Sequence, residues 1–233
     1  MPFYYYGYDL SYLIFVLPAV IFALWAQFHV NSTIRRYQKI RNSRGMTGCA
    51  AARAILDANG LQNISVEHIS GNLTDHYDPR ANVIRLSDAV YNSDSATAVG
   101  IAAHEAGHAI QHAQGYVPIK IRQAIIPVTS ICSNLSMPLI LLGLLFSFPS
   151  LAYIGVILFG ASTVFQLVTL PVEFNASARA IRVLDEYHYL EDDELRAAKK
   201  TLSAAALTYV AALAVSLANL LRLFLLVNRS KRK

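Results

Sequence analysis

The stretch AVGIAAHEAGHAIQHAQGY, residues 98–116, combines an apolar helical pattern with three histidines spaced four residues apart. His104 and His108 are one helical turn apart, so their imidazoles face the same way and can hold one zinc ion. Glu105 completes an H-E-x-x-H motif, in which the acid lies beside the metal and takes a proton from zinc-bound water. The stretch therefore predicts a catalytic zinc site on a helix.

The third histidine, His112, is a weaker candidate for a ligand. It lies about 80° around the helix from His104, and helical geometry disfavours ligands from three consecutive turns on one ion. The metzincin pattern would need histidine at position 114, where Gln114 stands. We interpret His112 as a surface residue or a residue that supports the ligands. A helix whose histidines only find hydrogen-bond partners is the alternative for the whole motif.

The composition indicates a membrane protein. Hydrophobic residues make up 55% of the 233 residues and charged residues 15%, and the mean hydropathy is +0.37, which is too apolar for an ordinary soluble domain. Four apolar segments have about the length of a bilayer crossing: residues 10–28, 125–148, 150–170 and 204–227. Since no Lys or Arg precedes the first segment, we expect an uncleaved span rather than a signal peptide.

Charge and cysteine usage exclude other classes. The net charge is +5, but the basic residues flank apolar segments and form no face with interleaved aromatics, so we expect no nucleic-acid partner. Cys49 and Cys132 lack metal-ligand spacing, and we expect two unpaired thiols.

The polar parts, residues 29–122 and 171–202, are expected to form the catalytic region. Their patterns predict helices over 46–60, with Thr47 as N-cap, and over 92–115, and strands over 63–69 and 82–87. The predicted fold class is a mainly α integral membrane protein with about four transmembrane helices and a small zincin-like α+β catalytic domain. We expect the whole chain, 1–233, to form one membrane-embedded domain.

Glu173 is the expected third ligand. Only two spans separate the two polar parts, and an even number returns the chain to the side of the H-E-x-x-H helix. A lone carboxylate at the end of an apolar run is costly unless it is solvated, paired or metal-bound. Two histidines and one glutamate leave an open position on zinc, and one Zn²⁺ per chain is expected. An ion pair with Arg179 is the alternative for Glu173.

Four stretches together carry a resemblance to a known family: AAHEAGHAIQ (102–111), DHYDPRANVIRLS (75–87), LPVEFNASARAI (170–181) and AAALTYVAA (204–212). They resemble the YugP-type neutral zinc metallopeptidases of bacterial membranes, which are similar in plan to HtpX-type proteases and CAAX prenyl endopeptidases. The resemblance implies His104, His108 and Glu173 as ligands and Glu105 as general base. HtpX-type enzymes have Asp four residues after the Glu ligand, where this chain has Ser177, so the supporting residue is left open between Ser177 and Asn175.

The expected function is that of a zinc-dependent membrane endopeptidase, with peptide or protein substrates and membrane lipid as partners. Its expected location is the bacterial cytoplasmic membrane. The basic residues at 35–44 place the catalytic part in the cytoplasm by the positive-inside rule, although the basic tail after residue 227 favours the opposite orientation. A zinc-binding scaffold without activity and a zinc hydrolase of non-peptide substrates are the alternatives, and the intact Glu105 argues against the first.

Two further roles are predicted from the pattern. Tyr209 is a candidate donor to the oxyanion, with His76, Tyr77 and His188 as alternatives. The stretch before the catalytic helix is expected to be a sheet edge on which the substrate pairs, with an interior strand as the alternative. Its residues are Asn82, Val83, Ile84, Arg85 and Leu86.

Overall fold

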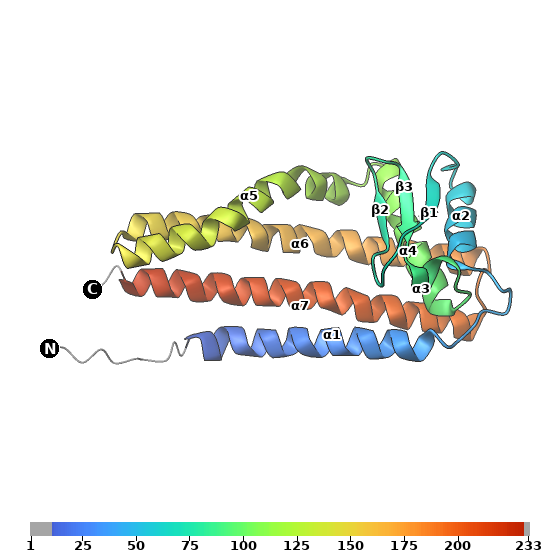
Figure 1. Ribbon diagram of the computed structural model, residues 1–233, viewed down its shortest axis with the longest axis horizontal. Coiled ribbons are helices and arrows are strands. Elements are labelled where there is room, and N and C mark those ends of the chain that lie inside the picture. Colours follow the sequence, from blue (N-terminus) through green and yellow to red (C-terminus); the bar gives the residue numbers. More distant parts are fainter. Residues whose placement is uncertain (1–10, 231–233) are drawn as a thin grey trace. The chain divides into compact units, whose positions relative to one another are not determined.

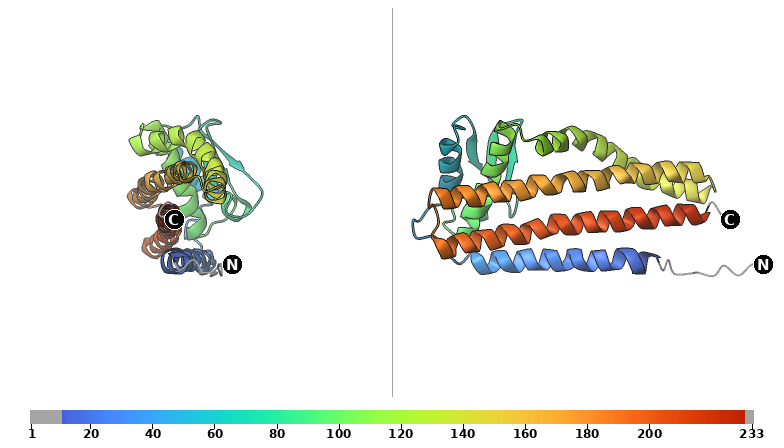
Figure 2. Two further views of the ribbon diagram at one scale, coloured as in Figure 1. Left: turned by 90° about the vertical axis from the view of Figure 1, so that its left-hand side faces the viewer. Right: turned by 180° about the vertical axis from the view of Figure 1, so that it is seen from behind.

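Helices make up most of the protein, whose computed structural model describes residues 11–230 (Figure 1). The chain divides into two compact units. The sheet-containing unit comprises Gln27–Ile121 and Thr169–Thr208, and the helical unit comprises the segment up to Ala26, Arg122–Val168, and the segment from Tyr209 onward. Two helices, α6 (Pro149–Glu186) and α7 (Asp192–Ser230), are continuous and contribute residues to both units (Figure 2). The predicted polar segment 171–202 therefore consists of the end of α6, a short connection and the start of α7.

Four helices in the described range are long and apolar enough to cross a membrane. The first is α1 (Leu17–Tyr37), which continues a short π-helical stretch, Tyr12–Val16. The others are α5 (Val117–Leu145), α6 (Pro149–Glu186) and α7 (Asp192–Ser230). α6 and α7 contain the predicted segments 150–170 and 204–227. The π-helical stretch and α1 together cover residues 12–28 of the predicted segment 10–28, and α5 covers 125–145 of the predicted 125–148, so the helix ends three residues earlier than predicted.

Within the helical unit, α5 and α6 form a tight hairpin, which the short break FPS (148–150) between two apolar segments predicts from the sequence. Two glycines allow their backbones to meet, since a Cβ on Gly143 would lie 2.4 Å from the Ala152 nitrogen and one on Gly155 would lie 2.7 Å from the Ser136 oxygen. Between α6 and α7, the hydroxyls of Thr163 and Ser216 are 2.8 Å apart. Small residues and hydroxyls at the contacts are typical of helices that pack within a membrane.

The sheet has three short strands in the order β1-β3-β2. They are β1 (Ser65–His68), β2 (His76–Asp78) and β3 (Val83–Leu86). β3 pairs in parallel with β1 and antiparallel with β2. β3 is therefore the middle strand, and the prediction that residues 82–86 form an exposed edge for substrate is wrong, because neighbouring strands already take both edges. Asn82 precedes the strand in a left-handed conformation, with φ of 51°.

The remaining helices of this unit are α2 (Gly48–Ala58), α3 (Asp88–Tyr91) and α4 (Ala96–Ala113). The Thr47 hydroxyl accepts from the Ala50 nitrogen, as predicted, and the Ser95 hydroxyl accepts from the Ala98 nitrogen. These bonds satisfy amide groups that a helix start leaves unpaired. The core between α2, α4 and the sheet contains Ile55, Leu56, Ile84 and Leu86, which are fully buried.

Helix α4 carries residues 104–108 and lies directly on the backbones of two long helices. A Cβ on Gly107 would be 2.6 Å from the carbonyl oxygen of Ala176 on α6. One on Gly100 would be 3.0 Å from the Cβ of Ala198 on α7. The glycines are needed because any side chain at these positions would push the helices apart.

Gly107→Ala should therefore lower the free energy of unfolding by about 1–3 kcal/mol, the cost of overpacking a contact that cannot yield. The measurement is thermal unfolding in detergent with a metal chelator present, so that loss of an ion cannot contribute. Gly160→Ala on α6 is the control, because a Cβ there meets nothing within 4 Å. Equal unfolding temperatures for the two variants would contradict the close contact.

Candidate metal centre

His104 and His108 on α4 converge on Glu173 of α6. The distance from Glu173 Oε2 is 3.2 Å to His104 Nε2 and 3.5 Å to His108 Nε2. One ligand atom from each residue lies within 4.8 Å of the others, so the three could hold a metal ion. The two imidazole rings stand nearly perpendicular, with centroids 4.7 Å apart. Glu173 thus joins His104 and His108 in one cluster, although it follows them in the sequence by 69 and 65 positions.

The spacing of these atoms fits a zinc ion. Zinc bonds nitrogen and oxygen ligands at about 2.0–2.1 Å in tetrahedral geometry, which separates neighbouring ligand atoms by about 3.3 Å. The two measured separations, 3.2 and 3.5 Å, lie on either side of that value. Two imidazoles and one carboxylate also leave a fourth position open, as in catalytic sites.

Gln111 fixes the proton on His108. The Gln111 Nε2 donates to the Val172 carbonyl oxygen at 2.8 Å, and a backbone carbonyl only accepts. The amide orientation is therefore determined, and its Oε1 lies 3.0 Å from His108 Nδ1. Since Oε1 accepts, Nδ1 must carry a proton, and the proton that leaves the ring when a metal binds is the one on Nε2, which faces Glu173. The ring is thus set in the tautomer that a metal requires.

A second layer of bonds supports Gln111. Its Nε2 also donates to Asn175 Oδ1 at 3.0 Å, and that oxygen accepts from Arg179 Nε at 2.7 Å. Arg179 donates in turn to Gln114 Oε1 at 2.6 Å. Arg179 therefore belongs to the network around Gln111, and the bonds that Glu173 makes to the histidines do not support the alternative of an Arg179–Glu173 ion pair.

His104 has a different partner. Its Nδ1 lies 3.1 Å from the hydroxyl of Ser177, one helical turn beyond Glu173 on α6. The hydroxyl can accept the Nδ1 proton, which leaves Nε2 toward Glu173. The sequence did not decide whether Ser177 or Asn175 supports the ligands. In the structure Ser177 contacts His104, and Asn175 contacts Gln111.

The cluster is buried. Glu173 is 3% exposed and His108 is 9% exposed. Burial alone lowers the pKa of His108, but the hydrogen bond with Glu173 and the charge of Glu105 outweigh it and raise that pKa above its usual value. A proton held there must leave when a cation binds, so metal affinity falls as the pH drops through the pKa of His108.

Glu105 lies outside the ligand cluster. It follows His104 on α4 and is 8% exposed. It is adjacent in sequence to one histidine of the cluster and three residues before the other, on the helix that carries both. The two acids therefore differ in position: Glu173 contacts both imidazoles, whereas Glu105 is not a member of the ligand cluster.

His112 points toward the sheet. Its ring packs edge-on against Tyr77 of β2, with centroids 6.1 Å apart, and it is not a member of the three-residue cluster. The other candidates for an oxyanion donor are spread out: His76 and Tyr77 lie on β2, and His188 follows α6. Tyr209 lies on α7, where the helical unit resumes. Its role stays a prediction.

Gln111 is the residue that sequence reasoning missed. The signal was its position three residues after His108, which puts both side chains on one helix face. A glutamine in that position becomes informative only when the carbonyl and amide of the neighbouring helix are known.

Comparisons with known proteins identify the family of this chain. The family model described as "Putative neutral zinc metallopeptidase" matches residues 12–228. A relative named "Putative membrane protease YugP", from Bacillus subtilis (strain 168), is 46% identical over 211 residues, which cover 91% of this chain and 94% of the relative. No solved structure matches the chain. The match across nearly the whole length shows that the chain belongs to this family of neutral zinc metallopeptidases.

Proposed function

We propose that the protein is a zinc-dependent membrane endopeptidase with a His-His-Glu ligand set and a zincin-like catalytic region. The observation that carries this proposal is the meeting of His104, His108 and Glu173 at zinc-like separations, with Glu105 buried beside them and outside the cluster. A protein that only stored zinc would need no second buried acid at that position.

The residues divide the work as follows. His104, His108 and Glu173 would hold zinc, which supplies a Lewis acid that polarises a peptide carbonyl and lowers the pKa of water toward about 7. Glu105 takes the proton of the attacking water and passes it to the leaving amine. Gln111 and Ser177 keep the two imidazoles turned toward the ligand position. Tyr209 is the proposed donor to the oxyanion.

Backbone pairing with a substrate is proposed at β2 in place of β3. β2 ends the sheet order, and its Tyr77 contacts His112 on α4. An extended peptide that adds to this edge would run beside the helix that carries Glu105. We propose membrane or membrane-associated proteins as substrates, since the enzyme has four apolar helices. The basic end of α1 supports a cytoplasmic position for the catalytic region in a bacterial membrane.

Purified protein should contain about one zinc ion per chain, because the cluster offers a single set of three ligands. His108→Ala should lose the ion, since two ligands hold zinc far less tightly than three. His112→Ala on the same helix is the control and should keep it. The measurement is metal content by mass spectrometry, and stoichiometric zinc in a His104→Ala/His108→Ala variant would refute the ligand assignment.

Gln111→Leu should lower zinc affinity by roughly 10- to 100-fold, the usual effect of removing a partner that orients a ligand. The substitution keeps the side-chain size but leaves the His108 tautomer undetermined. Gln114→Leu, at the C-cap of the same helix, removes only the outer bond to Arg179 and should change the affinity little. Competition with a zinc-binding dye gives both values. An unchanged affinity in Gln111→Leu would mean that the amide is merely a packing group.

Glu105→Gln should keep zinc and lose turnover by roughly 10²-fold or more, the scale of a lost general base. Glu173→Gln should lose both zinc and turnover, because a neutral amide oxygen replaces a charged ligand. The test compares metal content and hydrolysis of casein in one detergent, with and without a chelator. If Glu173→Gln keeps full zinc and near-normal hydrolysis, the His-His-Glu site is wrong. Chelator-insensitive or absent hydrolysis by the wild type would contradict the proposed activity itself.

A further inference from the structure

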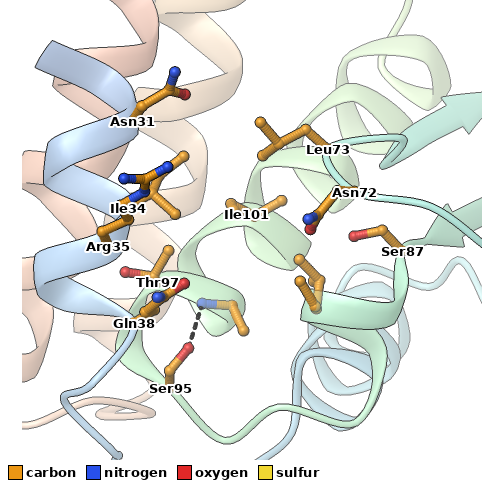
Figure 3. Close-up of a pocket in the computed structure, with 13 residues that line it drawn as sticks. Asn31, Ile34, Arg35, Gln38, Asn72, Leu73, Ser87, Ser95, Thr97 and Ile101 are labelled. Atoms are coloured by element: carbon orange, nitrogen blue, oxygen red, sulfur yellow. Dashed lines mark hydrogen bonds between the residues drawn. The ribbon is translucent and has the colours of Figure 1, made fainter. Parts of the chain in front are cut away.

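A cleft of about 360 Å³ opens in the sheet-containing unit between α1, the start of α4 and the loop before β2 (Figure 3). Asn31, Ile34 and Arg35 of α1, with Gln38 just after its end, lie on one side in this view, and Asn72, Leu73 and Ser87 lie on the other. Thr97 and Ile101 of α4 lie between them. None of the three metal-cluster residues lines it.

The cleft lies along the same helix as the metal centre. Ile101 precedes Glu105 by four residues, so the two side chains are about one turn apart and only about 40° apart around the helix axis. Ile101 is half-buried, whereas Thr97 is buried and shares a hydrogen bond with Thr201 of α7. Ile101 is therefore the residue of α4 that connects the level of Glu105 with the cleft.

Helix and strand dimensions set the register. Ile101 and Thr97 lie roughly 7 and 14 Å along the helix axis from the level of the ligands, at 1.5 Å per residue. An extended peptide advances about 3.3 Å per residue. A chain with its scissile bond at the metal centre would therefore place residues about two to four positions from that bond in the cleft.

The lining indicates what would bind there. Arg35 is exposed and is the one charged side chain among the residues that line the cleft. Three amides, those of Asn31, Gln38 and Asn72, offer both donors and acceptors to a peptide backbone. A guanidinium matches a carboxylate with two parallel hydrogen bonds. The lining of the cleft thus offers amides that can hydrogen-bond to a peptide backbone and one guanidinium that can bind a carboxylate, and it contains no Asp or Glu.

We propose that this cleft is a specificity subsite that binds substrate on one side of the scissile bond, with Arg35 selecting a carboxylate two to four residues from it. The carboxylate is that of an acidic side chain or of a peptide C-terminus. The inference rests on the proposed endopeptidase function and deepens it. Arg35 acts in binding and takes no part in the chemical step.

The test uses full-length, zinc-loaded Glu105→Gln protein in detergent, because binding is then measured without turnover. The probes are fluorescent peptides derived from a casein segment that the wild type cleaves. They carry Glu, Gln or Lys at one position, two to four residues from the bond, and a further pair has a free or an amidated C-terminus there. At one position, Glu or the free carboxylate should bind about tenfold more tightly than Lys or the amide, the scale of a charge-assisted hydrogen bond.

Arg35→Gln in the same background should abolish this preference, and Arg35→Glu should reverse it in favour of Lys. Arg36→Gln is the matched control, because it removes the same charge from the next residue of α1, which does not line the cleft. All variants should keep one zinc ion, a readout that separates loss of binding from loss of the site. In the wild-type background, Arg35→Gln should raise KM for the acidic peptide and leave kcat near its normal value.

The outcomes distinguish the two proposals. If the wild type cleaves no peptide, the endopeptidase function fails, and casein peptides of one fixed sequence with Glu, Gln or Lys at a central position then decide on Glu105→Gln protein whether Arg35 governs binding. If peptide binding is independent of Arg35, or if only vesicles of anionic phospholipid bind through it, the cleft is not a peptide subsite and the inference is overturned.

Discussion

The approach of α4 to the backbone of α6 is the constraint on which the site depends. Gly107 removes the side chain that would separate the helices, and only then do residues one turn to either side of it meet α6. His104 reaches Ser177, and Gln111 reaches the Val172 carbonyl and Asn175. The ligand cluster therefore depends on helix packing, and the distances between its ligand atoms would change if α4 and α6 moved apart.

Each imidazole is oriented by a neutral partner. A carboxylate partner would increase the basicity of the ring more strongly, but it would add another buried charge to a site that already holds Glu105 and Glu173. The amide of Gln111 sets the tautomer of His108 because the Val172 carbonyl can only accept. A backbone carbonyl of α6 thus determines, through Gln111, that Nδ1 of His108 on α4 carries a proton.

Much of this arrangement could be predicted from the sequence, because it follows from helical periodicity. The shared face of His104 and His108, the Thr47 cap and the α5–α6 hairpin are local features, and Glu173 followed from counting spans. The rest required tertiary contacts. The alternation of residues 82–87 identified a strand but not its middle position, and β2, with three residues, was too short to show a pattern. Gln111 has no distinguishing feature until Val172 and Asn175 are placed beside it.

X-ray absorption at the zinc edge tests the central claim most directly, because it reports the ligands of the bound ion without reference to activity. For protein that holds one zinc per chain, the account predicts a first shell of nitrogen and oxygen at about 2.0–2.1 Å, with outer-shell scattering from two imidazoles. Scattering from three imidazoles would show that a histidine other than His104 and His108 has taken the place of Glu173. A sulfur shell near about 2.3 Å would show that Cys49 or Cys132 binds the metal. Either result would contradict a site made of His104, His108 and Glu173.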